Sequence, residues 1–230
     1  MNQITMQENQ AERFIYTNNS IILSQNRYNM DIKKSQLDIL NLFRKNIFLS
    51  ETIRSISIKI KKPYQQVHRV IQELKDKKIL SIKEVGKGKV CELALSNETI
   101  SVLSFLDEQE ALERNITLIK DILQHKELLD DIVLVTGSYT KGTETKKSDI
   151  DLVVITKEDA FSKQRLIENL TALLLPKVHP IAITQKDFVS MLTDKKASFG
   201  KEIFKQRLIY RGASRYYELI KEAIDNGFRD

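Results

Sequence analysis

The stretch VTGSYTKGTETKKSDIDLVVI, residues 135–155, decides how the second half of this 230-residue chain is interpreted. It joins the end of one apolar run to the start of another, and a tight Gly137-Ser138 turn follows the first run. Ten residues separate Ser138 from Asp149, and Asp151 follows two positions later. Strand residues at i and i+2 point to the same face, so the two carboxylates are expected to project together.

Paired carboxylates beside a glycine-serine turn suit a metal-bound phosphate. Carboxylates at fixed spacing are hard oxygen ligands for Mg²⁺, which is usually shared with the phosphates of a substrate. The Gly137-Ser138 turn offers backbone N–H groups and a hydroxyl to a phosphate. The pattern therefore predicts that a triphosphate and a metal ion are held between two adjacent strands. The alternative is a surface turn followed by an acidic strand start.

The same residues resemble the signature of the nucleotidyltransferases of the DNA polymerase β superfamily. The fuller pattern, Gly137-Ser138-x-x-Lys141-Gly142 followed by Ser148-Asp149-Ile150-Asp151-Leu152, is similar to the minimal nucleotidyltransferase branch. The resemblance implies that Asp149 and Asp151 are the catalytic and metal-binding residues. It also implies that Gly137, Ser138 and Lys141 bind the nucleotide. The implied cofactor is Mg²⁺ or Mn²⁺, and the implied substrate is ATP or another nucleoside triphosphate.

The family usually carries a third carboxylate on the next central strand, and this sequence departs from that pattern. No acidic residue lies between Glu168 and Asp187. His179 stands near the expected position, where a histidine can act as a base or a weak metal ligand, although Pro180 beside it is typical of a strand end. Asp187 fits a capping role for the next helix, three residues after Thr184. Nucleotidyl transfer is therefore expected to be slow, or to need a partner that completes the site.

Composition is that of a globular protein. Hydrophobic residues make up 41% of the chain. No apolar run approaches the roughly 20 residues that a membrane helix needs. The N-terminus lacks a basic segment followed by an apolar one, so it does not resemble a signal peptide. The single cysteine, Cys91, excludes an internal disulfide framework and is expected to be a small buried residue. We therefore expect a cytoplasmic protein without a membrane partner.

The net charge of +6 is unevenly distributed along the chain. Residues 31–96 carry 15 Lys and Arg against 7 Asp and Glu, which gives +8. Residues 97–128 carry 3 against 7, which gives −4, and residues 129–230 carry 17 against 15, which gives +2. Positive charge clustered in one segment indicates a polyanionic partner for that segment.

Three helical segments followed by two apolar-patterned strands are expected within residues 31–96. This order resembles a winged helix-turn-helix domain, whose last helix, from Pro63 to about Lys78, would enter a DNA major groove. Polar side chains on that helix suit base edges, and lysines suit phosphates. The residues predicted to bind double-stranded DNA are Gln65, His68, Arg69, Gln72, Lys87 and Lys89, with Lys59, Lys61 and Lys62 as further phosphate contacts. Alternatively, the polar face is simply solvated, or the unit docks a protein or a second copy.

The predicted fold class is α+β, with a winged helix-turn-helix, a connector helix and a polymerase-β-like nucleotidyltransferase α/β domain. The expected boundaries are a mostly loose extension over 1–30, the winged helix-turn-helix over 31–96, the connector over 97–128 and the nucleotidyltransferase domain over 129–230. An apolar stripe on the connector, which is expected to run to about Gln124, also allows a homodimer contact.

The resemblance suggests three functional hypotheses. Stand-alone minimal nucleotidyltransferases are antitoxins that transfer AMP from ATP to a tyrosine of a HEPN-type toxin. The first hypothesis is therefore a DNA-binding, antitoxin-like enzyme that transfers AMP to a protein partner. The second is a nucleotide-sensing transcription regulator with a weak or inactive transferase domain, which the missing third carboxylate favours. The third, nucleotide addition to a nucleic-acid 3′ end or to an antibiotic, ranks lowest because the short chain leaves no obvious domain for such an acceptor.

Overall fold

The computed structural model describes residues 6–9, 12–16, 20–25, 28–86, 88–145 and 148–229. The chain divides into two compact units, Met1–Leu103 and Ser104–Asp230. Each unit combines helices with β-sheet, so the α+β prediction is confirmed at that level. Within the described parts, no helix is long and apolar enough to span a bilayer.

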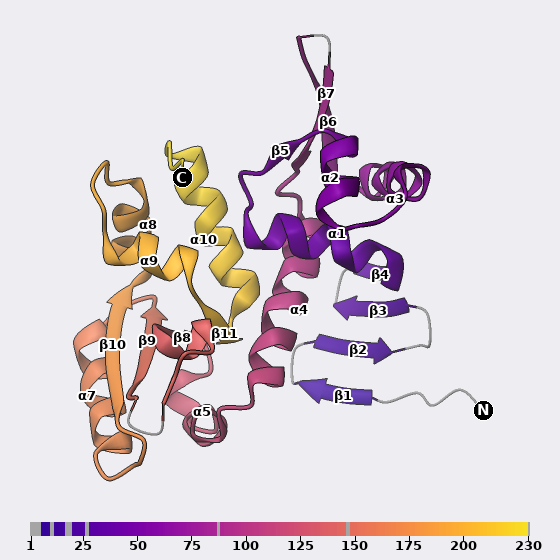
Figure 1. Cartoon of the computed structure of the whole chain (residues 1–230). Coiled ribbons are helices and arrows are strands. Elements are labelled where there is room, and N and C mark those ends of the chain that lie inside the picture. Colours follow the sequence, from indigo (N-terminus) through magenta and orange to yellow (C-terminus); the bar gives the residue numbers. More distant parts are fainter. Residues whose placement is uncertain are drawn as a thin grey trace. The chain divides into compact units, whose positions relative to one another are not determined.

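An antiparallel meander opens the first unit, where the sequence suggested a mostly loose extension. Its strands, in sheet order, are β1 (Met6–Asn9), β2 (Glu12–Tyr16), β3 (Ser20–Gln25) and β4 (Tyr28–Lys33) (Figure 1). The short apolar islands of this region pair with each other, as in Phe14 opposite Leu23 and Ile15 opposite Ile22. Aromatic and β-branched residues favour strands, which accounts for the difference from the expectation.

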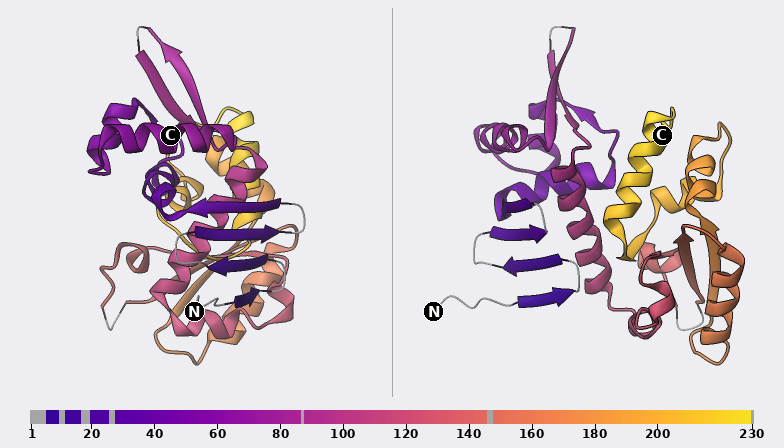
Figure 2. Two further views of the ribbon diagram at one scale, coloured as in Figure 1. Left: turned by 90° about the vertical axis from the view of Figure 1, so that its right-hand side faces the viewer. Right: turned by 180° about the vertical axis from the view of Figure 1, so that it is seen from behind.

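The rest of the first unit is a helical module with a hairpin. Its elements are α1 (Lys34–Lys45), β5 (Ser50–Glu51), α2 (Ile53–Lys59), α3 (Tyr64–Asp76), β6 (Leu80–Val85) and β7 (Gly88–Leu93). The β6–β7 hairpin projects past the three helices (Figures 1 and 2). The short strand β5 adds to the sheet beside β7, and the sequence did not predict it. The three helices and the hairpin match the expected order.

Apolar spacing explains how these helices pack. Val67, Val70, Ile71 and Leu74 of α3 are all buried, as their 3.6-residue period predicts. Phe43 of α1 is buried in the same unit, and α1 and α3 contact each other. The opposite side of α3 is left to solvent, which leaves its polar residues available to a partner.

The predicted connector is two helices rather than one. Helix α4 (Asn97–Arg114) crosses the division between the units, and α5 (Thr117–Ile122) follows it. Asn115 has φ 49°, a left-handed conformation that ends an α-helix and that asparagine tolerates better than most residues. The second compact unit begins at Ser104, inside the segment that was predicted to be a connector.

A four-stranded mixed sheet forms the centre of the second unit. Its strands are β8 (Ile132–Thr136), β9 (Ile150–Thr156), β10 (Val178–Thr184) and β11 (Leu208–Arg211), in the order β10-β9-β8-β11. Strand β10 is parallel to β9, and β8 is antiparallel to both of its neighbours. The apolar patterns of the sequence predict strands at 131–136, 149–156 and 177–183, which agree with β8, β9 and β10 within one residue at each end, whereas β11 was missed.

Helices cover both faces of this sheet. One face, with Val133, Val135, Leu152 and Val154, forms a buried cluster with residues of α4, α5 and α7 (Ala160–Thr171). The alternate strand residues face the side on which α8 (Gln185–Thr193) and α10 (Ala213–Asp225) pack, with α9 (Phe199–Lys205) against α8. Asp151 shares this second face, since it is two residues from Val153 along β9.

Candidate functional site

A glycine turn at the end of β8 meets the start of β9. The antiparallel register pairs Thr136 with Asp151, so the chain leaving β8 passes beside that carboxylate. Gly137 has φ 74° and ψ −143°, which L side chains rarely adopt. A β-carbon built on Gly137 would overlap Oδ2 of Asp151 and lie 3.2 Å from its Cγ. Glycine is therefore required here both by the backbone and by the neighbouring carboxylate.

The predicted turn continues as a short helix. Helix α6 (Ser138–Lys141) begins directly after Gly137, and the Thr140 hydroxyl donates a hydrogen bond to the Gly137 carbonyl over 2.7 Å. Gly142, at φ 66°, ends the helix. The first N–H groups of a helix have no acceptor within it, so they are suited to an anion. Ser138 stands at this start, and Lys141 is exposed at the other end.

Asp149, Asp151 and His179 converge at one edge of the sheet. Parallel pairing of β10 with β9 sets His179 opposite Asp151. The His179 Nε2 atom lies 3.3 Å from Asp149 Oδ2, and its Nδ1 atom lies 4.0 Å from Asp151 Oδ1. The three side chains are 61%, 37% and 40% exposed for His179, Asp149 and Asp151. The two carboxylates thus flank one imidazole, which is the most exposed of the three side chains.

Gln164 of α7 fixes the backbone of β10 next to the histidine. Its Nε2 atom donates to the Pro180 carbonyl over 2.6 Å, and its Oε1 atom accepts from the Ala182 N–H over 2.7 Å. These groups lie on β10, which among the described strands is at the edge of its sheet and pairs with β9 alone. Gln164 was not singled out from the sequence, because its role depends on a contact made 16 to 18 residues away.

Tyr139 is a second residue that the sequence analysis missed. Its hydroxyl donates to the Ser148 carbonyl over 3.3 Å, so it ties α6 to the loop that leads into Asp149. The pKa of Tyr139 is raised by burial and, to a smaller extent, by the negative charges of Glu144 and Asp149. Its position directly after Ser138 in the motif is the sequence feature that could have identified it.

The donor set fits a divalent ion that shares its ligands with a substrate. Across the described segments, no three His, Cys, Asp or Glu side chains are gathered closely enough to hold a metal ion as they are placed. Mg²⁺ usually binds through one or two carboxylates, with water and substrate phosphates completing its shell. Asp149 and Asp151 provide those two carboxylates, partly exposed and on one edge. Lys146 and Lys147, between α6 and Asp149, lie outside the described residues.

A groove on the first unit gathers part of the predicted DNA-binding set. It has a volume of about 500 Å³, and it is lined by Thr52, Ile53, Arg54, Tyr64, His68, Gln72, Lys75, Ile82, Glu84 and Lys89. His68, Gln72 and Lys89 were predicted, whereas Arg54, Tyr64 and Lys75 were not. Gln65 and Arg69 are exposed on α3 outside this lining, and Lys87 lies outside the described residues.

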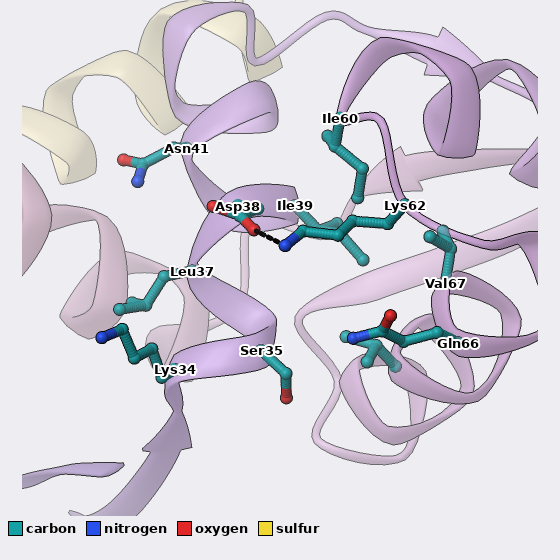
Figure 3. Close-up of a pocket in the computed structure, with 11 residues that line it drawn as sticks. Lys34, Ser35, Leu37, Asp38, Ile39, Asn41, Ile60, Lys62, Gln66 and Val67 are labelled. Carbon is teal, nitrogen blue, oxygen red and sulfur yellow. Dashed lines mark ion pairs between the residues drawn. The ribbon is translucent and has the colours of Figure 1, made fainter. Parts of the chain in front are cut away.

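Ion pairs reduce the free positive charge of this unit. Lys89 pairs with Glu84 at 3.5 Å on the hairpin, and Lys59 pairs with Glu51. Lys62 lies 3.8 Å from Asp38 across a separate pocket of about 540 Å³ between α1 and α3 (Figure 3). Exposed pairs of this kind are weak. These pairs therefore add little to stability.

A known protein family matches the part of the chain that contains the Asp149, Asp151 and His179 site. Residues 116–210 match the family model described as nucleotidyltransferase domain. The match includes β8, β9, β10 and β11 almost to its end, together with Gly137, Asp149, Asp151 and His179. No curated protein matches the chain. The family match supports a nucleotidyl transfer function for this unit, with a nucleoside triphosphate as the substrate class.

Proposed function

We propose that the second unit binds a nucleoside triphosphate with a divalent ion and transfers its nucleotidyl group, AMP in the case of ATP, to a hydroxyl of a protein partner. The observation that carries the proposal is the convergence of the Asp149 and Asp151 carboxylates with the Gly137 turn, inside a region that matches the nucleotidyltransferase family. Mg²⁺ or Mn²⁺ is the proposed ion.

The residues of the chain bind and orient the substrate. Asp149 and Asp151 would hold the ion through their carboxylate oxygens. When bound, the ion neutralises phosphate charge around the α-phosphorus. The N–H groups at the start of α6 and the Ser138 hydroxyl would donate hydrogen bonds to the outer phosphates, and Lys141 at the other end of α6 would reach a phosphate oxygen. Positioning and charge neutralisation account for most catalysis in phosphoryl chemistry, so few other groups are needed.

The proposed reaction is an in-line displacement. The acceptor hydroxyl oxygen forms a bond to the α-phosphorus, and the bond from that phosphorus to the oxygen bridging to the β-phosphate breaks. Pyrophosphate leaves with the electron pair, and the hydroxyl proton passes to solvent. Slow turnover is expected, because no acidic residue lies between Glu168 and Asp187 to assist the hydroxyl.

Transfer of labelled AMP tests this proposal. Full-length protein is incubated with α-labelled ATP, Mg²⁺ or Mn²⁺, and a HEPN-type toxin as candidate acceptor. Asp149→Asn and Asp151→Asn are expected to abolish labelling, while Asp130→Asn, which removes the same charge from an exposed position of the same unit, leaves it unchanged. Labelling that survives loss of both site carboxylates would contradict the proposal.

A second candidate, a nucleotide sensor that regulates transcription, is favoured by the first unit. The order α1-β5-α2-α3-β6-β7 and the net charge of +8 over residues 31–96 support a winged helix-turn-helix that binds double-stranded DNA. Arg69→Ala and Gln72→Ala are expected to weaken DNA binding, measured by fluorescence anisotropy over a salt series, and Lys45→Ala on α1 is the control. DNA affinity that changes with ATP while no label is transferred would favour the sensor over the enzyme.

A further inference from the structure

We propose that His179 is a third protein ligand of the divalent ion, and that it makes the site prefer a transition-metal ion over Mg²⁺. This inference rests on the proposed function, since it concerns the same ion that Asp149 and Asp151 are proposed to hold. The inference goes beyond the proposed function because it names a nitrogen ligand and the kind of ion that this ligand favours.

The ladder places His179 where a third ligand is needed. His179 is the register partner of Asp151 in the parallel β9–β10 pair, so the two side chains share one face of the sheet. Its Nε2 atom is 3.3 Å from Asp149 Oδ2, a separation comparable to that of neighbouring ligands around one ion. The other ring nitrogen, Nδ1, is 4.0 Å from Asp151 Oδ1, so the ring lies beside both carboxylates, and Nε2 is the nitrogen proposed to bind the ion.

Among the described residues that flank Asp151, Thr136 and Gly137 offer no competing ligand. Thr136, its partner on the β8 side, donates its hydroxyl to the Gln206 carbonyl over 2.9 Å. Gly137 has no side chain, and the Asp151 carboxylate lies against it. His179, the partner of Asp151 on the β10 side, differs from both in that its ring nitrogens face the two carboxylates.

The backbone of β10 beside His179 is held by hydrogen bonds from α7. Gln164 bonds the Pro180 carbonyl and the Ala182 N–H, which fixes the β10 backbone on the C-terminal side of His179. The His179 side chain is the most exposed of the three, at 61% against 37% for Asp149 and 40% for Asp151, and the Asp151 carboxylate lies against Gly137. A fixed β10 backbone and an exposed imidazole let His179 turn toward an ion held at the two carboxylates.

Ligand chemistry then decides which ion is preferred. Mg²⁺ takes oxygen ligands almost exclusively, whereas imidazole nitrogen binds the later first-row divalent ions, with affinity rising from Mn²⁺ to Co²⁺. Two carboxylates and one imidazole therefore favour Co²⁺ or Mn²⁺ over Mg²⁺ more strongly than three carboxylates would.

Co²⁺ binding to the metal-free full-length protein tests the assignment, because its visible absorption reports the ligands directly. Titrations are made with Co²⁺ alone and in competition with Mg²⁺, on wild type, His179→Ala, His179→Asp and the control His125→Ala. Even the loss of residues outside the ligand shell typically costs 10–100-fold in metal affinity, so His179→Ala is expected to weaken Co²⁺ binding about tenfold or more. His179→Asp is expected to lower the preference for Co²⁺ over Mg²⁺, and His125→Ala to change neither.

The outcomes separate this inference from the proposed function. Equal or tighter Co²⁺ binding by His179→Ala, with binding lost in Asp149→Asn and Asp151→Asn, overturns the assignment of His179 and leaves the carboxylate site intact. Co²⁺ binding that is absent in the wild type, or unaffected by either aspartate substitution, overturns both. Circular dichroism of each variant establishes that it is folded.

Discussion

The carboxylate of Asp151 lies against the Cα of Gly137, so closely that a β-carbon at position 137 would overlap it. The two residues are 14 positions apart in the sequence and come together because Thr136 and Asp151 are partners in the β8–β9 ladder. The same contact sets the direction of the carboxylate and brings the start of α6 beside it. The Gly137 turn and the Asp151 carboxylate are therefore parts of one site, and each limits the space of the other.

Gly137→Ala is expected to damage both stability and binding. The alanine must adopt φ 74°, ψ −143° or rearrange the turn, at a cost of about 1–3 kcal/mol, and its methyl group displaces the Asp151 carboxylate. Gly227→Ala is the matched control, since Gly227 has φ 96° and open space around its missing β-carbon. Thermal unfolding is expected to show a loss in both variants, whereas titration with Mn²⁺ and ATP is expected to show a loss in Gly137→Ala alone. Normal binding of Mn²⁺ and ATP by Gly137→Ala would show that the site does not depend on the contact between Gly137 and Asp151.

A buried ion pair is expected to be critical for the stability of the second unit. Arg207 contacts Asp107 at 3.4 Å and the Tyr217 hydroxyl at 3.0 Å, and the two charged side chains are 9% and 5% exposed. Burial alone would lower the pKa of Arg207, but Tyr216, Tyr217 and Asp107 raise it, so it stays charged. Asp107→Ala leaves that charge unpaired and is expected to lower the free energy of unfolding by about 3–5 kcal/mol.

Urea unfolding measures this loss, and two further variants interpret it. Replacing both partners, in Asp107→Leu with Arg207→Met, removes the unpaired charge and is expected to recover part of the stability. Glu218→Ala breaks the exposed pair with Arg215 at 2.8 Å and is expected to change the free energy by less than about 1 kcal/mol. A small effect of Asp107→Ala would mean that solvent reaches Arg207.

The sequence predicted those parts of the fold whose signal is local. Strands β8 and β9 are apolar apart from Asp151 and their final threonines, and Thr184 accepts a hydrogen bond from the Asp187 N–H as the capping pattern indicated. The apolar period of α3 likewise placed its buried face correctly. Each of these depends on residues within a few positions of one another.

The missed features depend on pairing between distant segments. Strand β11 is only four residues long and follows α9 after two residues, so its apolar residues looked like a continuation of the helix. Its pairing with β8 is made across more than 70 positions. The sequence placed His179 near the site, but its approach to Asp149 from a neighbouring strand follows from the β9–β10 register, which no local pattern encodes. The break at Asn115 rests on a single left-handed residue.

The stability of the first unit is expected to fall at alkaline pH through Cys91. The thiol is fully buried, and burial raises its pKa to about 11 from an ordinary value of 9.0. The unfolded chain then releases this proton at lower pH than the folded one. The contribution to stability is fully present below pH 9 and is lost as the pH rises toward 11. Urea unfolding between pH 8 and about 11 measures this, with Cys91→Ala as reference. An equally steep fall in Cys91→Ala would assign the loss to other groups.

Gln164→Ala is expected to loosen the edge strand that carries His179. The substitution removes the hydrogen bonds to the Pro180 carbonyl and the Ala182 N–H, each contributing about 0.5–1.5 kcal/mol to stability. It also leaves those backbone groups open to pairing with a second chain, so self-association is expected to increase. Glu168→Ala is the control, because it removes the 2.8 Å contact on the solvent side of Gln164 and spares the bonds to β10. Thermal unfolding and sedimentation are the measurements, with hydrogen exchange at Ala182 as the local readout. Unchanged protection of the Ala182 amide would show that β10 stays ordered without Gln164. The hydrogen bonds of Gln164 would then not be what fixes the backbone beside His179.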